Sequence, residues 1–287
     1  MRHHRHFLTS KYWFITDRCV DERFFLRAGK EVHEVILAAM KLACDRSGVA
    51  LLAFVIMSNH WHLTVERTED PRSIAVFMQT LKATVAREMN ERYGRRGPFW
   101  SRRYSAQPIL DEQSLTERIL YVLMNPVRAG IAATVQEYPG LSSLEANTGM
   151  RGACGSIELP IALPQQWRGL DATELSVQKA WIRNELRARE KVVREERIAK
   201  GLPRPKAERC LQIDPWERPK KPDFRPAPLC FAATKKARSA FARLRASFVQ
   251  AYKAASEAFR SGVLDVMFPA GSFPPRLLKP PVEAPAC

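Results

Sequence analysis

The feature that most constrains the fold of this chain is a pair of apolar runs separated by a short polar break. Residues 50–56 and 60–66 are mostly apolar, β-branched or aromatic, and Ser58-Asn59 lies between them. Such near-continuous apolar segments are typical of strands at the centre of a sheet. We therefore expect two buried strands joined by a tight turn, with the rest of the domain built around them.

The second run begins His60-Trp61-His62. Side chains two residues apart on a strand point to the same face, so His60 and His62 are expected to stand side by side, with Trp61 on the other face. Two adjacent imidazoles on a rigid strand are potential metal ligands. The alternative is two partly exposed histidines on an edge strand, and the spacing alone leaves both open.

These strands belong to an alternating order of strands and helices within about the first 145 residues. Helical segments show apolar residues at spacings of three and four, and further strands are rich in aromatic and β-branched residues. This order predicts an α+β domain, a ferredoxin-like or RRM-like antiparallel sheet with helices on one face. The expected elements are strands at 10–17, 50–56, 60–66 and 104–110 and helices at 31–46, 70–93 and about 111–125.

Local signals indicate where two of these helices begin and end. Asp70-Pro71 places a capping side chain before a proline at the first helical position. Ser114 and Glu117 have the spacing of a capping box. Pro126 disfavours the helical conformation in the residue before it, so the last of these helices is expected to end near Asn125.

The second half of the chain is expected to be an extension of this domain. Residues 146–172 are rich in Gly, Pro and small polar residues and are interpreted as a linker. Residues 173–287 are basic, partly Pro-rich and partly helical, with helices at about 172–200 and 232–261. Three roles are open for this extension: DNA binding, self-association, or covering the site of the first domain.

Composition restricts the partners. The 46 Lys and Arg residues exceed the 30 Asp and Glu residues, and the net charge of +16 favours a polyanion such as nucleic acid. A basic protein without such a partner is the alternative. The six cysteines form no Cys-x-x-Cys pair, which argues against a zinc knuckle and suits reduced thiols in a cytoplasm. No run is long and apolar enough to suggest a membrane partner.

A mixture of cationic and aromatic residues near position 100 is a candidate DNA-binding segment. Such a mixture can stack bases and hold phosphates. Alternatively, the aromatic rings pack into the core and the cations face solvent. The candidate DNA-binding residues are Arg95, Arg96, Arg102 and Arg103, together with Arg128 after the third helix.

Tyr121 lies one helical turn before Asn125, so the two side chains share a face. If that face covers the sheet surface that carries His60 and His62, the four residues form one site. The histidines and the Asn125 amide oxygen could then hold a divalent cation that polarises a phosphate, and the Tyr121 oxygen could attack phosphorus. The alternative is a core tyrosine with its hydroxyl on a backbone carbonyl and a helix-end amide, and spacing alone favours this alternative.

Two sequence blocks resemble a known family. Phe54 to Glu66 is similar to the histidine-hydrophobe-histidine motif of single-tyrosine HUH transposases. Arg103 to Asp111, followed by Tyr121 to Gly130, resembles the second block of the same family. Within this family, the blocks most resemble the REP-associated tyrosine transposases, a bacterial branch of the insertion-sequence type. The resemblance covers about residues 8–145. Neither block is specific alone, but the two in this order and spacing are.

The resemblance implies a fold, an activity and site residues. Family members bind single-stranded, hairpin-forming DNA, such as palindromic repeats or element ends. They nick it through a 5′-phosphotyrosine and rejoin it with Mg²⁺ or Mn²⁺. By this resemblance Tyr121 is the nucleophile and His60 and His62 are catalytic metal ligands. Asn125 stands where other branches have a glutamine ligand.

Two other functions remain open beside a transposase. One is a domesticated, catalytically silent binder of structured DNA or RNA. The other is an HUH relaxase or replication initiator. The chain is about 140 residues longer than typical members of the family, which leaves self-association, and catalysis in cis or across a dimer, open.

Overall fold

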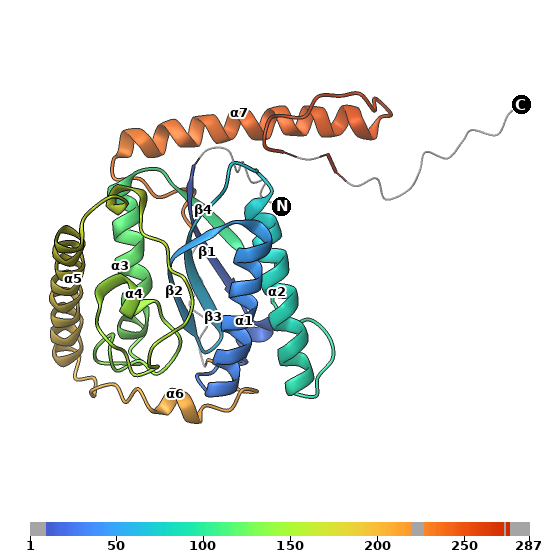
Figure 1. Cartoon of the computed structure of the whole chain (residues 1–287). Helices are drawn as coiled ribbons and strands as arrows, with labels where there is room; N and C mark the ends of the chain where they lie inside the picture. Colours follow the sequence, from blue (N-terminus) through green and yellow to red (C-terminus); the bar gives the residue numbers. More distant parts are fainter. Residues whose placement is uncertain (1–9, 220–226, 273, 276–287) are drawn as a thin grey trace, which may run out of the picture.

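The computed structural model describes residues 10–219, 227–272 and 274–275. Its centre is a four-stranded antiparallel sheet with the strand order β2-β3-β1-β4 (Figure 1). The strands are β1 (Tyr12–Arg18), β2 (Ala50–Met57), β3 (His60–Glu66) and β4 (Ser105–Ile109). All four predicted strands are therefore confirmed, with ends that differ by one or two residues.

The two apolar runs pair as a hairpin across Ser58-Asn59, with Met57 opposite His60. On its other side β3 pairs with β1, where Thr16 lies opposite His62. The histidine strand is thus an inner strand, flanked on both sides, and the edge-strand alternative is wrong. β2, in contrast, lies at the edge of the sheet, so the expectation of a central position is wrong for this strand. Its near-continuous apolar character has another cause, because both faces of the sheet are covered.

Two helices cover one face of the sheet. They are α1 (Lys30–Ser47) and α2 (Ser73–Arg92), and Figure 1 shows them side by side along the sheet. Strand side chains alternate, so Trp13, Ile15 and Trp61 point toward these helices and are almost completely buried. They meet the apolar stripes of α1 and α2, in which Ile36, Met40, Phe77 and Leu81 are fully buried.

The opposite face is covered by α3 (Glu112–Arg128). The alternate residues of the strands, Phe14, Val55 and Met57, pack there in a separate apolar cluster with Ile119 and Leu123 of α3. The α+β class and the antiparallel sheet are confirmed. The expectation that all helices lie on one face of the sheet is wrong for α3, which packs on the opposite face. Both faces of the sheet are apolar, so both must be covered.

The ends of α2 and α3 differ from their predictions. Asp70 Oδ1 accepts the Arg72 amide proton at 2.8 Å in the turn before the helix, and α2 begins only at Ser73. Asp111, not Ser114, caps α3, because Asp111 Oδ1 accepts the Ser114 amide proton at 2.7 Å. The predicted Ser114–Glu117 capping box is therefore wrong, since Ser114 lies inside the first turn.

The third helix also continues through Pro126 to Arg128. A proline inside a helix lacks one hydrogen-bond donor and disfavours the helical conformation before it. Here the residues around it, Asn125 and Val127, are buried. Packing against the sheet thus overrides the local preference, and the predicted end at Asn125 is three residues too early.

The segment after α3 is attached to the sheet at several points. In α4 (Leu144–Thr148) and just before it, Asn147 donates to the Leu52 carbonyl at 2.9 Å and Ser143 Oγ accepts the Phe54 amide proton at 2.8 Å. Trp167, in the short 3-10 helix Gln165–Trp167, is buried in the α3-side cluster. The predicted linker is hence packed along much of its length, while the division into domains stays a prediction.

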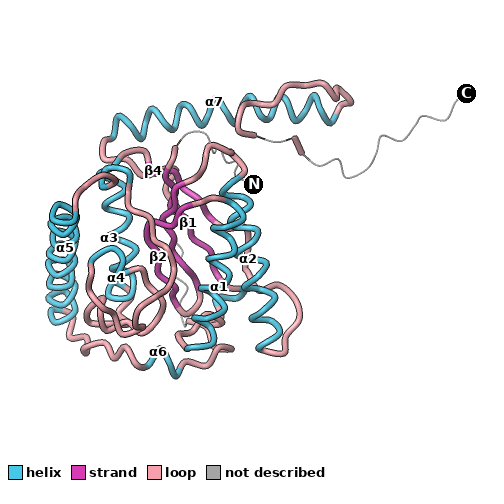
Figure 2. The backbone as a smooth tube through the Cα atoms, viewed as in Figure 1, coloured by secondary structure: helices cyan, strands magenta, loops and turns pink. Residues whose placement is uncertain are grey.

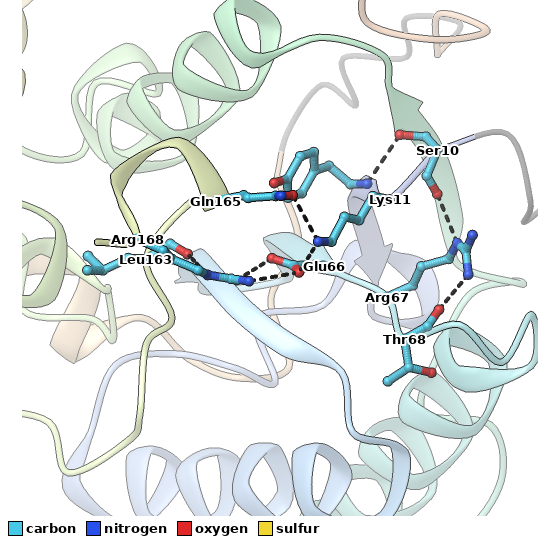
Figure 3. A network of polar contacts seen from close by, with 9 residues as sticks. Ser10, Lys11, Glu66, Arg67, Thr68, Leu163, Gln165 and Arg168 are labelled. Atoms are coloured by element: carbon cyan, nitrogen blue, oxygen red, sulfur yellow. Dashed lines mark hydrogen bonds and ion pairs between the residues drawn. The ribbon is translucent and has the colours of Figure 1, made fainter. Parts of the chain in front are cut away.

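A polar network fixes this segment at the end of β3 (Figure 3). The carboxylate of Glu66 is nearly buried and receives both terminal nitrogens of Arg168, one of them at 3.2 Å. Lys11 lies 3.0 Å from the same carboxylate and donates to Gln165 Oε1 at 2.9 Å. These contacts hold three distant parts of the chain together.

The extension is largely helical, as predicted, with α5 (Ala172–Ala199), the short α6 (Arg209–Gln212) and α7 (Lys235–Arg260) (Figure 2). On α5, Ile182 and Leu186 are fully buried in the α3-side cluster. Further on, Phe231 pairs with the outer edge of β4. Within the described residues, no helix is both long and apolar enough to cross a membrane.

Candidate functional site

The sheet face under α3 brings together the histidine pair and the helix tyrosine. The ring centroids of His60 and His62 are 4.9 Å apart, and those of His62 and Tyr121 are 5.7 Å apart. Alternation along β3 puts both imidazoles on this face and buries Trp61 on the other. The helix that carries Tyr121 therefore covers the sheet face that carries His60 and His62, as a common site requires.

Phe14 of β1 holds these rings in place. Its ring stacks on His62 at 5.5 Å with an interplanar angle of 17°, and meets Tyr121 edge-on at 5.7 Å. Because Phe14 is itself buried, the two reactive rings lie against a fixed apolar surface. Such packing limits rotation of the side chains and so preorganises the site.

Asn59 orients His60. The Asn59 amide nitrogen donates to the Glu22 carbonyl at 2.9 Å, and Asn59 Oδ1 lies 2.6 Å from His60 Nδ1. Since the Asn59 oxygen can only accept, we assign the proton of the neutral imidazole to Nδ1. His60 Nε2 then carries the lone pair, which is the nitrogen that can bind a cation.

Both histidines are held neutral. Burial, together with the nearby Arg18 charge, lowers the pKa of His60 to about 3. Burial likewise holds the pKa of His62 well below its usual value, with added contributions from His60, Arg18 and Arg118. A neutral imidazole is the form that ligates metals, and His62 Nδ1 is a buried nitrogen without a hydrogen-bond partner in the described part of the chain.

Two arginines flank the tyrosine. The guanidinium carbon of Arg118 lies 4.7 Å from the centre of the Tyr121 ring, and that of Arg128 lies 5.4 Å from it. Arg118 also lies 4.3 Å from the ring centre of Phe231 and 6.0 Å from that of Phe14. Burial lowers the pKa of Arg118, and the Tyr121 and Glu117 oxygens oppose that shift. Arg118 remains a cation because arginine titrates far above neutral pH.

Asn125 lies one turn after the tyrosine, as predicted. Its Nδ2 donates to the Tyr121 carbonyl at 3.1 Å, and its side chain is buried. This bond uses the amide nitrogen, so the amide oxygen is the atom that could bind a cation. An amide oxygen is a ligand type of Mg²⁺ and Mn²⁺, whereas imidazoles are more typical of transition-metal sites, so this mixed set fits Mn²⁺ better than Mg²⁺. Among the described residues, no three His, Cys, Asp or Glu side chains form a potential metal group, so within these residues a third side-chain ligand would be of another type, such as this amide.

The five predicted DNA-binding arginines are not in one place. Arg128 lies beside Tyr121, whereas Arg95 is engaged within its own loop. Its guanidinium donates to Asn90 Oδ1 at 2.6 Å and to the Pro98 carbonyl at 2.9 Å, and it lies 4.6 Å from the Phe25 ring centre. Arg96, Arg102 and Arg103 are exposed.

Arg103 lines a shallow groove of about 520 Å³ on the α2 side of the sheet. The groove also contains Lys82, Trp100 and Tyr104. The predicted mixture of aromatic rings and cations is thus present, but it lies on the face opposite the histidines. The roles of these arginines in DNA binding stay predictions.

Sequence reasoning missed Arg118 and Phe231. Arg118 precedes Tyr121 by three residues on one helix, a spacing that places both on one face and could have identified it. Phe231 comes from the extension, 110 positions after the tyrosine, and no local pattern indicates that its ring reaches Phe14 at 5.5 Å.

The first part of the chain is similar to a known family of proteins. Residues 11–122 match the family described as IS200-like transposases. A curated protein of Haemophilus influenzae, described as a REP-associated tyrosine transposase, is 25% identical over 111 residues. These residues are 36% of this chain and 63% of that relative, so the match spans less than two thirds of its length. The predicted resemblance is confirmed for this region, which contains His60, His62 and Tyr121 and ends before Asn125.

Two solved structures are also similar. One is a REP-associated tyrosine transposase bound to a REP hairpin, with 15% sequence identity, a TM-score of 0.45 and coverage of 57% of this chain and 94% of that chain. The other, from Deinococcus radiodurans, is described as a transposase and has 19% identity, a TM-score of 0.31 and coverage of 42% and 95%.

Proposed function

We propose that this protein is a transposase-type DNA strand transferase that nicks and rejoins single-stranded, hairpin-bearing DNA through a 5′-phosphotyrosine. The observation that carries the proposal is the cluster of His60, His62 and Tyr121 on one sheet face. These residues come from two distant segments that both lie within the region matching IS200-like transposases. A nucleophile beside two neutral imidazoles suits phosphoryl transfer.

In the proposed nicking step, the Tyr121 oxygen attacks the scissile phosphorus and its proton passes to water. The new bond joins the tyrosine oxygen to phosphorus, and the bond from phosphorus to the 3′ oxygen breaks. The released 3′ oxygen takes up a proton, and the 5′ side stays attached to the enzyme. Rejoining reverses this step, since a 3′ hydroxyl attacks the phosphotyrosine and releases Tyr121.

The residues around Tyr121 would assist this chemistry in different ways. Arg118 and Arg128 lie against the Tyr121 ring and would place positive charge near the attacking oxygen and the phosphate. Phe14 keeps the rings of His62 and Tyr121 in register. A Mg²⁺ or Mn²⁺ ion held by His60, His62 and the Asn125 amide oxygen would polarise the phosphate and stabilise its developing charge.

The proposed substrate follows from charge and resemblance. The net charge of +16 favours a polyanion, and the relative from Haemophilus influenzae is described as REP-associated. Palindromic sequences fold into hairpins when single-stranded, which suits a site that acts on one strand. The five described cysteines are free thiols, and we place the protein in the cytoplasm, where thiols stay reduced.

A covalent-adduct assay tests the proposal. The intact chain is incubated with single-stranded oligonucleotides that carry palindromic hairpins, with Mg²⁺ or Mn²⁺, and the protein is resolved under denaturing conditions. Wild type is expected to form a DNA-linked species, and Tyr121→Phe is expected to form none. Tyr93→Phe is the control, because it removes a phenol near Phe25, away from the histidines.

Two outcomes would contradict the proposal. If Tyr121→Phe forms the adduct at the wild-type level, the nucleophile is wrong. If the protein binds hairpins but leaves them intact with every divalent cation tried, the silent binder of structured nucleic acid is favoured instead.

A further inference from the structure

Helix α7 has an unusual charge distribution. Among its 26 residues, seven are Lys or Arg and one is Glu. The 28-residue helix α5 also has seven basic residues, but it carries five Glu residues that largely balance them. Alternating charges of the α5 kind stabilise a solvated helix. The excess positive charges on α7 repel one another and do not stabilise the helix, so their presence requires another explanation.

The charges of α7 gather on one side of the helix. At about 100° per residue, all seven basic residues fall within one half of the helical surface. Phe241 and Phe248 lie on the other half and are buried. The basic positions are Lys235, Lys236, Arg238, Arg243, Arg245, Lys253 and Arg260.

Six of these seven side chains, all but Arg245, are exposed along the length of the helix. Lys235, Lys236, Arg243 and Lys253 are exposed, and no ion pair involves them within the described ranges of the chain. The aromatic rings of α7 lie elsewhere, since Tyr252 and Phe259 pack against Phe268 in the segment that follows. The basic face therefore offers cations without exposed rings.

The start of α7 is fixed beside the candidate site. Phe231 donates its amide proton to the Pro108 carbonyl at 2.9 Å, and the Ala233 amide donates to Asp111 Oδ2 at 2.8 Å. The Phe231 ring touches Arg118, which in turn flanks Tyr121. Figure 1 shows α7 running from this point across one end of the fold and beyond it.

We propose that the basic face of α7 binds the phosphate backbone of double-stranded DNA, namely the stem of the hairpin whose single strand enters the site. This inference rests on the proposed function. A 26-residue helix is about 39 Å long, which matches about 11 base pairs of duplex. Single-strand binders combine cations with stacking rings, whereas this face has cations alone, as phosphate tracking of a duplex requires.

Binding measurements on the intact chain test this assignment. The neutral variant combines Lys235→Gln, Lys236→Gln, Arg243→Gln and Lys253→Gln. A matched control neutralises, in the same way, three exposed cations of α5 and the exposed lysine that follows its last residue: Arg187, Lys191, Arg194 and Lys200. A charge-retaining variant exchanges Lys and Arg at the four α7 positions. The probes are a DNA hairpin with a stem of about 12 base pairs and an unstructured single strand of equal length, in chelator and over a salt series.

The α7 variant is expected to bind the hairpin at least about tenfold more weakly than wild type, with a salt dependence shallower by about 3 to 4 in log–log slope. The unstructured strand is expected to bind all proteins alike, and the charge-retaining and α5 variants are expected to match wild type on the hairpin. Equal salt slopes for wild type and the α7 variant would overturn the assignment. So would an equal loss of affinity for both probes. Because no cleavage is needed, a failure of Tyr121 to form an adduct refutes only the proposed function.

Discussion

Arg118 is expected to control the rate of the tyrosine attack. Its guanidinium is stacked between the rings of Tyr121, at 4.7 Å, and Phe231, at 4.3 Å. When the tyrosine oxygen approaches phosphorus, negative charge develops on the phosphate and on the phenol oxygen. A cation already fixed beside them stabilises that charge without reorganisation. Arg118→Gln removes this charge but keeps a polar side chain of medium length.

The size of the effect follows from the distance. The guanidinium carbon lies 4.7 Å from the centre of the Tyr121 ring, and this distance is taken as the scale of the charge separation. Two unit charges at that distance interact by about 3.5 kcal/mol at an effective dielectric constant of about 20. Arg118 is partly exposed, and solvent screening reduces this value to about 1 to 2 kcal/mol. The expected loss is therefore roughly 5- to 30-fold in the rate of the covalent step. Arg128 is more exposed and lies farther away, at 5.4 Å, so Arg128→Gln is expected to lose less.

The assay is the single-turnover rate of adduct formation at saturating DNA, which separates the chemical step from binding. Arg118→Lys is the matched variant, because it keeps the charge and loses the flat stacking surface. It should stay within about threefold of wild type. A rate for Arg118→Gln equal to wild type would refute the electrostatic role. If Arg118→Lys were as slow as Arg118→Gln, the stacking geometry and not the charge would be responsible.

Two further predictions concern stability. The folded-state pKa values of His60 and His62 lie below the usual value near 6.5. Below about pH 6.5 the unfolded chain therefore binds more protons than the folded chain, and the free energy of unfolding falls as the pH is lowered. Urea unfolding at about pH 7.5 and at about pH 5.5 should show that this free energy is lower at pH 5.5 by about 1 kcal/mol per histidine. Replacing both histidines by Gln should make the free energy of unfolding depend less on pH. An unchanged pH dependence in this variant would contradict the prediction. Glu66→Gln removes a nearly buried charge from Lys11 and Arg168 and should cost about 1 to 2 kcal/mol of unfolding free energy, because its partners are partly solvated. Glu137→Gln, whose partner Arg204 is exposed, should change stability by less than about 0.5 kcal/mol, and similar losses for both variants would show that burial of Glu66 is unimportant.

Periodicity predicted the elements of the first 145 residues because each element buries a regular set of side chains. The period of two along β1 and β3 and the stripes of α1 and α2 are local properties, so they can be read from neighbouring residues. The helix ends were predicted less well. Capping and proline preferences are worth about 1 to 3 kcal/mol each, and burial of Val127 and its neighbours is enough to carry α3 past Pro126.

The candidate site was likewise predictable in its local parts and not in their assembly. His60 and His62 were predictable as neighbours on a strand, and Tyr121 and Asn125 as neighbours on a helix, because each pair is local. That the two pairs face each other depends on α3 crossing the second face of the sheet, which no local pattern encodes. The sequence resemblance supplied that link, and the ring contact of His62 with Tyr121 now gives it a physical form.

The extension and the first 145 residues depend on each other physically. Ile182 and Leu186 of α5 are buried in the cluster that supports α3, and Arg189 pairs with Glu117 at 2.8 Å, one residue before Arg118. Phe231 pairs with the open edge of β4 and covers Arg118. A chain ending near residue 150 would expose this edge and the apolar back of the helix that carries Tyr121, and exposed edges invite aggregation. Loss of activity in such a truncation would therefore report on the support of α3, and single substitutions in the intact chain are what separate catalysis at Tyr121 from DNA binding by α7.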